Sequence, residues 1–251
     1  MDDTTVIKPI FWNSAELSDI GTVRSANEDA VFSNVPARFW AVADGMGGHS
    51  KGDVASRMIV EALARLQIPD ALDDASELVE QCLLDINRQM LEYSEVMFDR
   101  AVMGSTVVSL LVRGREAVCL WAGDSRLYCF RNGKLRQLSR DHSYVQDLVD
   151  CGAIQPHEAA NHPNSNVITR AVGVDSDLKI ETAGFEIEVD DDFLLCSDGL
   201  YNAVPLEDIC LCMALREPAE AARSLVDTAI KYGASDNVSV VVVKSAPGSF
   251  L

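Results

Sequence analysis

The sequence predicts an α+β fold, in which antiparallel sheets pack against each other and helices lie outside them. Short apolar runs typical of strands fill the middle of the chain, and segments with apolar residues at helical spacing occur in pairs towards both ends. The turn signals Arg113-Gly114 and Asn132-Gly133 separate neighbouring runs. Asn-Gly between two alternating segments is the strongest short-range hairpin signal, so antiparallel strand pairing is expected.

The expected elements follow in order along the chain. In the first third, residues 38–43 predict a strand, and the segments 52–66 and 74–97 predict two helices. In the middle, the runs STVVSLLV, EAVCLWA, RLYCFR and KLRQLS predict successive strands. The last third predicts the strands LKIETAGFEIE and DFLLCS, helices over 205–214 and 218–231, and a final strand NVSVVVVK.

Residues 143–170 differ from the strand-rich middle because they are polar and contain Pro156 and Pro163. We expect them to form a helical excursion or flap over a site. The chain has no internal repeat and no linker rich in Pro, Gly or Ser. We therefore expect a single domain over 1–251, with residues 1–13 as a loose extension.

The composition excludes several classes of protein. A formal net charge of −18 disfavours nucleic-acid binding, which needs a basic surface. The acidic excess indicates either a soluble surface or carboxylates that are concentrated in a cleft and need cations. No stretch approaches the ~20 apolar residues that span a bilayer, and the acidic N-terminus lacks the features of a secretory signal.

The seven cysteines are odd in number and lack zinc-type spacing. Most lie in apolar runs, as Cys119 does in AVCLWAG and Cys196 in FLLCSDG. We interpret them as small core residues of a protein in a reducing cytosol, so a cytoplasmic location is expected. Nothing in the sequence requires an oligomer, and a monomer is expected.

Five aspartates share one context, beside a strand-like run and close to Gly, Ser or Asn. They are Asp29, Asp44, Asp124, Asp198 and Asp236. A carboxylate at the end of a buried strand is held rigidly yet points at a cleft, and a neighbouring glycine lets a ligand approach. Several such carboxylates would repel one another unless a divalent cation joined them, and oxygen ligands select Mg²⁺ or Mn²⁺. Each aspartate alone is more typical of a turn, so the cation site depends on all five contexts together.

Seven short motifs, taken together, resemble the bacterial branch of the metal-dependent PP2C (PPM) Ser/Thr protein phosphatases. The motifs are R-S-A-N-E-D at 24–29, A-D-G-M-G-G-H at 43–49, G-S-T at 104–106, G-D-S-R at 123–126, I-T-R-A-V-G at 168–173, C-S-D-G-L at 196–200 and S-D-N at 235–237. The resemblance covers roughly residues 15–244. No single motif is specific, but seven in the family's order and spacing are.

The resemblance implies a β-sandwich of two antiparallel sheets flanked by helix pairs, with two Mn²⁺ or Mg²⁺ ions in a cleft at one end. Asp44 would bridge the two metals, and the carbonyl of Gly45 would bind one of them. Asp198 and Asp236 would hold the first metal.

The same resemblance implies further site residues. Asp29 would support the metal pair directly or through bound water, and Asp124 together with Asp198 would bind a third, weaker metal. Glu28 would not share the role of Asp29, because neighbouring side chains on a strand point to opposite faces. Arg24 matches the arginine that grips the substrate phosphate, for which its planar fork is suited.

The implied reaction is hydrolysis of phosphoserine and phosphothreonine in proteins. Two metals lower the pKa of a shared water, and the resulting hydroxide attacks phosphorus in line with the leaving oxygen. His49 is a candidate for protonating that oxygen or for binding substrate, and the alternative is a residue that only begins a helix.

Other classes fit the sequence less well. A cysteine-dependent phosphatase needs Cys, five residues and Arg, a spacing found at 82–88 and 210–216 in segments that have helical character and no glycine. A non-catalytic relative could lose its ligands, whereas the five aspartates and Arg24 are all present. The chain has no G-x-S-x-G and no kinase-type glycine loop with its lysine.

The resemblance also implies partners. Phosphorylated proteins are the expected substrates, and a bacterial Hanks-type Ser/Thr kinase is the enzyme whose action would be reversed. Some compact relatives act in type VI secretion loci, and a role of that kind is one option here.

Overall fold

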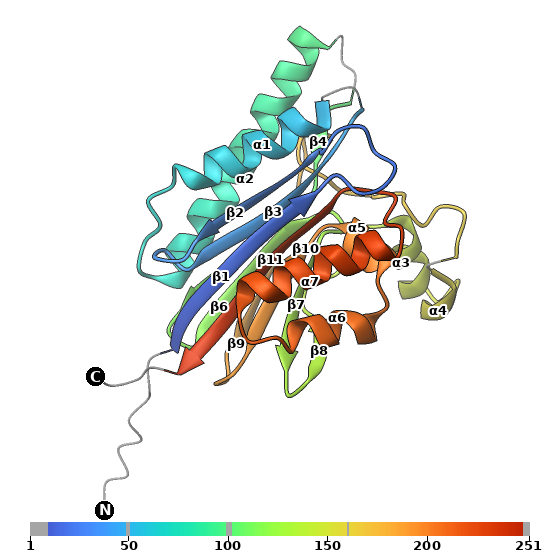
Figure 1. The fold of residues 1–251 in the computed structure, drawn as a ribbon. Helices are drawn as coiled ribbons and strands as arrows, with labels where there is room; N and C mark the ends of the chain where they lie inside the picture. The colour runs from blue at the N-terminus through green and yellow to red at the C-terminus, as the bar shows by residue number, and fades with distance from the viewer. Residues whose placement is uncertain (1–9, 49–50, 99–101, 160, 248–251) are drawn as a thin grey trace, which may run out of the picture.

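The computed structural model describes residues 10–48, 51–98, 102–159 and 161–247. Two antiparallel sheets lie face to face, and helices cover the outer face of each sheet (Figure 1). This arrangement of helix, sheet, sheet and helix layers confirms the predicted α+β sandwich.

The two sheets and the helices have the following bounds. The first sheet contains, in spatial order, β1 (Ile10–Asp19), β11 (Val238–Pro247), β10 (Asp192–Cys196), β7 (Arg126–Arg131) and β8 (Lys134–Gln137). The second contains β2 (Asp29–Asn34), β3 (Phe39–Met46), β5 (Val107–Arg113), β6 (Glu116–Ala122) and β9 (Glu181–Glu186), with β4 (Gly104–Ser105) paired to β3. The helices of the described ranges are α1 (Lys51–Ala64), α2 (Leu72–Met97), α3 (Tyr144–Asp150), α4 (Pro156–Ala159), α5 (Asp198–Ala203), α6 (Leu206–Met213) and α7 (Pro218–Lys231).

The apolar run near the C-terminus forms β11, which is buried on both faces. Side chains alternate along a strand. Val240 and Val242 pack under the C-terminal helices, whereas Val241 and Val243 face the second sheet. A strand between a helical layer and another sheet is apolar at successive positions, which explains the unbroken run of valines.

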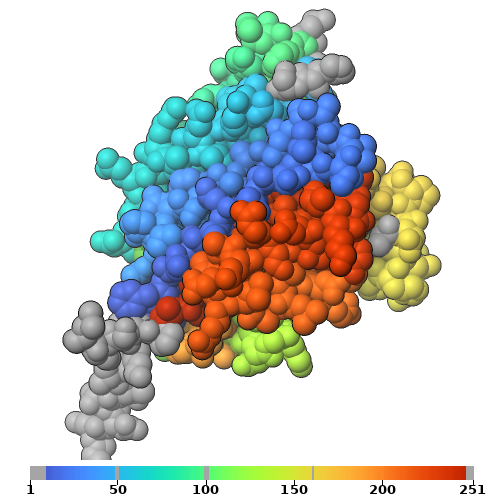
Figure 2. Space-filling view, in the orientation of Figure 1, coloured from blue at the N-terminus to red at the C-terminus, as the bar shows by residue number. Residues whose placement is uncertain are grey.

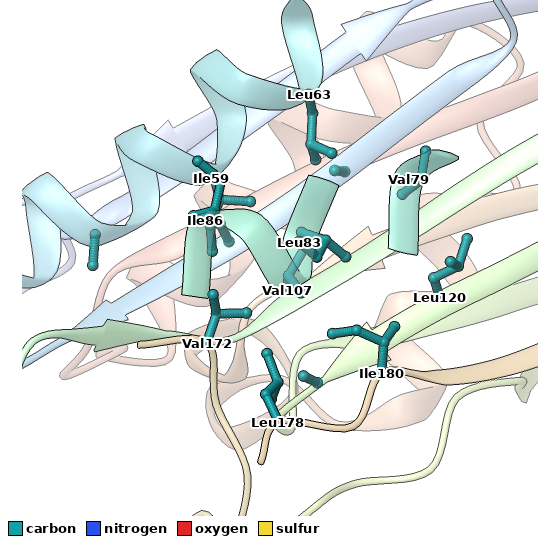
Figure 3. Packing of buried hydrophobic residues seen from close by; sticks show 14 of the residues in the cluster. Ile59, Leu63, Val79, Leu83, Ile86, Val107, Leu120, Val172, Leu178 and Ile180 are labelled. Carbon is teal, nitrogen blue, oxygen red and sulfur yellow. The ribbon is translucent and has the colours of Figure 1, made fainter. Parts of the chain in front are cut away.

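The helices α1 and α2 cover the second sheet. Ile59 and Leu63 of α1 and Leu83 of α2 pack in one cluster with Val107 and Leu120 of the sheet (Figure 3). All five side chains are at most 1% exposed. Full burial of such a side chain contributes roughly 1.5–3 kcal/mol, so this layer holds the second sheet firmly in place.

Two segments differ from the expectations. Residues 10–13, expected in a loose extension, belong to β1 and pair with β11, and Trp12 packs with its ring centroid 6.3 Å from that of Trp40. The expectation is therefore wrong for these residues, while residues 1–9 lie outside the described ranges. Helix α5 was not predicted, because its six residues are too few to show a helical period.

The turns and the crossing between the sheets determine where strand ends meet. The expected hairpins β5–β6 and β7–β8 are present. Asn132 and Gly133 have φ angles of 52° and 73°, the left-handed conformations of a type I′ turn. Strands β6 and β7 belong to different sheets, so the chain crosses from one sheet to the other at residues 123–125.

Residues 143–170 form the expected excursion and carry α3 and α4. We call this segment the flap. A bridge between Ser143 and Ile168 closes its base, where the N–H of Tyr144 also donates to the carbonyl of Val167 at 2.8 Å. In Figure 2 the flap (yellow) lies beside the layer of C-terminal helices (orange to red).

Within the described ranges, no helix is both long enough and apolar enough to cross a membrane. The seven cysteines are free thiols, and Cys119 and Cys196 are buried as expected for core residues.

Candidate active site

The five aspartates meet at one end of the sandwich. Asp29 opens β2 and lies directly opposite Asp44 of β3 in the antiparallel register. Asp198 follows β10 and begins α5, Asp236 precedes β11, and Asp124 lies at the crossing between the sheets. All four other carboxylates act electrostatically on Asp44, so segments far apart in the sequence are gathered around this residue.

Asp44 is the most strongly affected carboxyl group. Burial raises the pKa of Asp44 well above its ordinary value, and the charges of the four other aspartates raise it further. The ionised form of Asp44 is therefore unfavourable unless a positive charge lies beside it.

Three other aspartates share this behaviour, and burial is the main cause in each. Burial raises the pKa of Asp29 to about 6, although hydrogen bonds from Ser239 and Ser197 oppose the shift. It raises the pKa of Asp124 to about 6. It raises the pKa of Asp198 to about 8, with the charge of Asp124 as the second cause. Strongly perturbed pKa values in a cleft are typical of functional sites.

Neighbouring donors hold two of these carboxylates. Ser197 donates from Oγ to Oδ2 of Asp29 at 2.7 Å, and Asn202 donates from Nδ2 to Oδ2 of Asp198 at 3.1 Å. The other oxygen of Asp29, Oδ1, is buried and has no hydrogen-bond partner in the described part of the chain. No role for Ser197 was predicted from the sequence, where its place in the C-S-D-G-L motif was the available signal.

Arg24 reaches the cluster from the rim. Its Nη2 donates to Oδ2 of Asp236 at 2.6 Å, while Oδ1 of Asp236 accepts from the backbone N–H of Asn237 at 2.8 Å. The Arg24 side chain is 51% exposed. A charged fork that is anchored on the cluster and open to solvent is well placed to meet an incoming phosphate.

The backbone of Asp44 is held by the G-S-T motif. The N–H of Thr106 and the Oγ of Ser105 donate to the Asp44 carbonyl at 2.8 and 3.0 Å. The next residue, Gly45, is tightly enclosed: a Cβ there would lie 2.1 Å from the carbonyl oxygen of Gly52. Only glycine fits this position, because any side chain would collide with backbone.

Asn237 ties the loop that carries Arg24 to the S-D-N motif. Its Nδ2 donates to the carbonyls of Ile20 and Ala26 at 2.9 and 3.0 Å, and its Oδ1 accepts from the N–H of Glu28 at 2.8 Å. Asn237 is only 4% exposed. Its positioning role was missed from the sequence, where the S-D-N motif was the available signal.

Glu28 lies beside the site on the side of α1. A Cβ built on Gly52 would lie 2.8 Å from both the carboxyl carbon of Glu28 and the carbonyl oxygen of Gly45. These two groups therefore border the same small space beside Gly52.

The turn at Asp124 is supported by the side chains of Tyr201 and Arg126. Tyr201 donates from its hydroxyl to the carbonyl of Asp124 at 3.0 Å, and the guanidinium of Arg126 lies 3.5 Å from the centre of the Tyr201 ring. Arg126 also donates to both carboxylate oxygens of Asp141, at 3.0 and 2.6 Å. The charge of Arg126 is thus balanced, and its planar group supports the turn.

His142 connects this turn to the base of the flap. Its Nδ1 accepts from the N–H of Gly123 at 3.1 Å, its Nε2 lies 2.8 Å from Oε2 of Glu181, and its ring stacks on Trp121. Burial lowers the pKa of His142, which favours the neutral ring, and Nη1 of Arg170 also lies 3.1 Å from its Nε2. His142 thereby positions the flap and the Asp124 turn together.

A cleft of about 740 Å³ opens beside the aspartates. Asp124, Asp198 and Asp236 line it, and it continues between the flap and the segments 199–203 and 232–235. Its volume lies within the range of roughly 300–1,000 Å³ that is usual for ligand sites.

The donor set suits a hard cation. Every predicted ligand offers oxygen, with no His or Cys among them. As they are placed in the described ranges, no three His, Cys, Asp or Glu side chains come close enough together to hold a metal ion. A buried oxygen of Asp29 without a hydrogen bond and an Asp44 that resists ionisation would both gain from a positive charge between them. His49 lies outside the described residues, so its role stays a prediction.

The cysteine-dependent alternative fails on geometry. Cys82 and Arg88 both lie within α2, and Cys210 lies within α6. A helix cannot curl its N–H groups around a phosphate. Burial also raises the pKa of Cys82, which is the opposite of what a nucleophilic thiolate requires.

Clustered carboxylates suit divalent cations and a neighbouring arginine suits a phosphate group, so this end of the sandwich has the groups of a protein that binds both. A family model described as protein phosphatase 2C matches residues 22–235. The chain belongs to the protein phosphatase 2C family, as the motifs predicted.

Two curated relatives illustrate the similarity. The serine/threonine phosphatase stp of Listeria welshimeri is 38% identical over 237 residues, which cover 90% of this chain and 93% of that protein. The serine/threonine protein phosphatase PstP of Mycobacterium tuberculosis is 38% identical over 228 residues. That match covers 91% of this chain but spans only 44% of the length of PstP.

Solved structures agree with the fold. PppA, described as a key regulatory component of T6SS in Pseudomonas aeruginosa, has a TM-score of 0.86 and 40% identity, with 94% of this chain and 98% of that chain covered. The catalytic domain of the serine threonine protein phosphatase PstP in complex with 2 manganese ions has a TM-score of 0.83 and 36% identity, with 94% and 99% covered.

Proposed function

We propose that this protein is a serine/threonine protein phosphatase that hydrolyses phosphoserine and phosphothreonine in other proteins and requires Mn²⁺ or Mg²⁺. The observation that carries the proposal is the convergence of four aspartates around the buried Asp44, with Arg24 anchored at their rim. Membership of the protein phosphatase 2C family and the names of the relatives support it.

The oxygen donors of the cluster would hold two ions and a third, weaker one. The residues proposed for the pair are Asp44, the Gly45 carbonyl, Asp198 and Asp236, with Asp29 in support, and Asp124 and Asp198 are proposed for the third ion. When bound, the ions supply an activated water and neutralise charge on the phosphoryl group.

Arg24 would bind and orient the substrate phosphate. Its fork presents parallel N–H groups to two phosphate oxygens, and it would exchange one anionic partner, Asp236, for another. Asn237 would keep the loop that carries Arg24 in place while Arg24 exchanges its partner. His49 is proposed to protonate the leaving oxygen or to contact the substrate.

We also propose a biological setting. The substrates would be proteins phosphorylated by a bacterial Hanks-type Ser/Thr kinase, and the chain would act as a monomer and a single domain in the cytoplasm. The free thiols suit a reducing compartment. The similarity to PppA supports a role in type VI secretion as a second option.

The proposal is tested by hydrolysis of a phosphothreonine peptide with Mn²⁺, with excess EDTA, and by an Asp198→Ala variant. We expect activity that requires the metal and falls by at least about 100-fold in the variant. Activity that persists in EDTA would overturn the metal-dependent mechanism. Inactivity with Mn²⁺ or Mg²⁺ on a panel of phosphopeptides would point to a binding protein.

A further inference from the structure

The cleft extends well beyond the aspartates, along the inner wall of the flap. Val145, Val149 and Pro156 of the flap line it on one side, and Ala203 and Tyr232 line it on the other. We propose that this part of the cleft, the flap subsite, receives an apolar side chain that flanks the phosphorylated residue of the substrate. This inference rests on the proposed phosphatase function.

Charge is confined to the inner end of the cleft. Among the described lining residues, the charged groups are the three site aspartates and the pair formed by Arg126 and Asp141. That pair is internally balanced by three hydrogen bonds between the guanidinium and the carboxylate. The flap subsite therefore offers no opposite charge to an acidic or basic side chain of a substrate.

The loss of water from an entering side chain determines which side chains the flap subsite can bind. A charged side chain that entered the flap subsite would lose water without gaining a partner, which is unfavourable. An apolar side chain would instead remove its own surface and that of Val149 and Pro156 from water. Gln146 and Asn166 also line the cleft. Gln146 donates to Asp150 and Asn166 accepts from Ser165, and each amide has further donor and acceptor sites for a peptide backbone without adding charge.

The flap subsite and the aspartates belong to one continuous cleft. A peptide whose phosphate is bound at the aspartates can therefore also occupy the flap subsite. Asp198 lies at the start of α5, and Ala203 at the end of the same helix faces the flap subsite within one cleft. An extended peptide advances about 3.3 Å per residue, so a phosphate held at the aspartates leaves neighbouring side chains in the cleft.

The first test compares three phosphothreonine peptides that differ only in the residues on both sides of the phosphothreonine, which are Leu, Glu or Lys. Para-nitrophenyl phosphate, which carries no flanking residues, reports the chemistry alone. With Mn²⁺, we expect kcat/KM for the Leu peptide to exceed the other two by about tenfold, as for an apolar group that enters an apolar pocket.

The second test changes the charge of the flap subsite. Val149→Asp and Val149→Lys place opposite charges in it, and Val167→Asp is a matched control because Val167 belongs to the flap, is 48% exposed and does not line the cleft. Ratios of kcat/KM between peptides are compared within each variant, so differences in the amount of folded enzyme cancel. We expect Val149→Asp to raise the Lys-to-Leu ratio and Val149→Lys to raise the Glu-to-Leu ratio, each by about tenfold. Val167→Asp should keep the wild-type ratios.

The outcomes separate the two proposals. Hydrolysis with equal kcat/KM for the three peptides, or with a preference for a charged flank, would overturn the flap subsite and leave the phosphatase function intact. Equal shifts in Val149→Asp and Val149→Lys would also overturn it. No hydrolysis of any peptide or of para-nitrophenyl phosphate would overturn both proposals.

Discussion

Arg24 donates a hydrogen bond from Nη2 to Oδ2 of Asp236 at 2.6 Å. One residue is proposed to grip the phosphate and the other to hold a metal, so the ion pair links the two halves of the site. The two side chains are 51% and 34% exposed, and exposed ion pairs contribute only roughly 0.2–1 kcal/mol. Arg24 can therefore leave Asp236 at little cost when a phosphate arrives.

Replacing Arg24 by Gln should raise the affinity for the metal and lower the activity on a phosphorylated substrate. Loss of the cation frees Asp236, so the affinity for Mn²⁺ measured by calorimetry should rise by up to about fivefold, the equivalent of an exposed ion pair. Loss of the fork should lower kcat/KM for a phosphothreonine peptide by about 100-fold. Arg24→Lys keeps the charge and serves as the control, with Mn²⁺ affinity close to wild type. Weaker Mn²⁺ binding in Arg24→Gln would show that Arg24 does not compete for Asp236.

Replacing Asp44 by Asn should stabilise the protein in EDTA at pH 8 while abolishing activity. Burial and the charges of the neighbouring aspartates raise the pKa of Asp44, so its ionised form costs free energy in the folded state. We expect the free energy of unfolding to rise by roughly 1–3 kcal/mol. Each kcal/mol should raise Tm by about 2–4 °C. A lower Tm in EDTA would contradict this account of the site.

The stability in EDTA should fall as pH rises. An aspartate with a raised pKa binds more protons in the folded state than in the unfolded state, so the free energy of unfolding decreases between the two pKa values. Asp29 and Asp124 contribute from their ordinary value of 3.8 up to about 6, and Asp198 contributes up to about 8. Urea unfolding at a series of pH values, compared with Asp44→Asn, measures the slope. Saturating Mn²⁺ should flatten it between pH 6 and 8, and a slope of the opposite sign in EDTA would refute the burial of these groups.

Replacing Asn237 by Ala should loosen the loop that carries Arg24. The change leaves the Glu28 N–H and the carbonyls of Ile20 and Ala26 without their partner, and one such unsatisfied buried group costs roughly 1–3 kcal/mol. Urea unfolding should show a loss of that size, and hydrogen exchange of the loop amides should accelerate.

The control for Asn237 is an exposed asparagine of the flap. Asn161→Ala should change the free energy of unfolding by less than about 0.5 kcal/mol, as is usual for surface positions. Equal effects of the two substitutions would exclude a positioning role for Asn237.

Two glycines next to the site should respond differently to alanine. A Cβ at Gly45 would lie 2.1 Å from the carbonyl oxygen of Gly52, so Gly45→Ala should cost roughly 3 kcal/mol or more. Gly48 has a φ of 63°, and a Cβ there would meet no described residue within 4 Å, so Gly48→Ala should cost only the roughly 1–2 kcal/mol of a left-handed residue. Thermal unfolding of both variants measures the difference. Equal losses would mean that close packing does not enforce glycine at position 45.

Local signals predicted the elements whose conformation depends on neighbouring residues. Asn132-Gly133 supplies its own left-handed angles, and the valines of β11 alternate between two apolar layers. Residues 10–13 could not be assigned in this way, because their strand exists through pairing with β11 at the other end of the chain. Asn237 was missed for the same reason, since its partners lie in the loop 20–28.

The sequence by itself determined the order of the elements and the kind of chemistry, because residue types and their spacing are local properties. It provided five aspartates at strand ends and an arginine, a set suited to divalent cations and phosphate. Only the tertiary structure decided that these groups act on one another. The register of β2 and β3 places Asp29 opposite Asp44, and the crossing between the sheets brings Asp124 to the same end. Burial and distance set the pKa of a carboxyl group, and both arise only when segments far apart in the chain pack together.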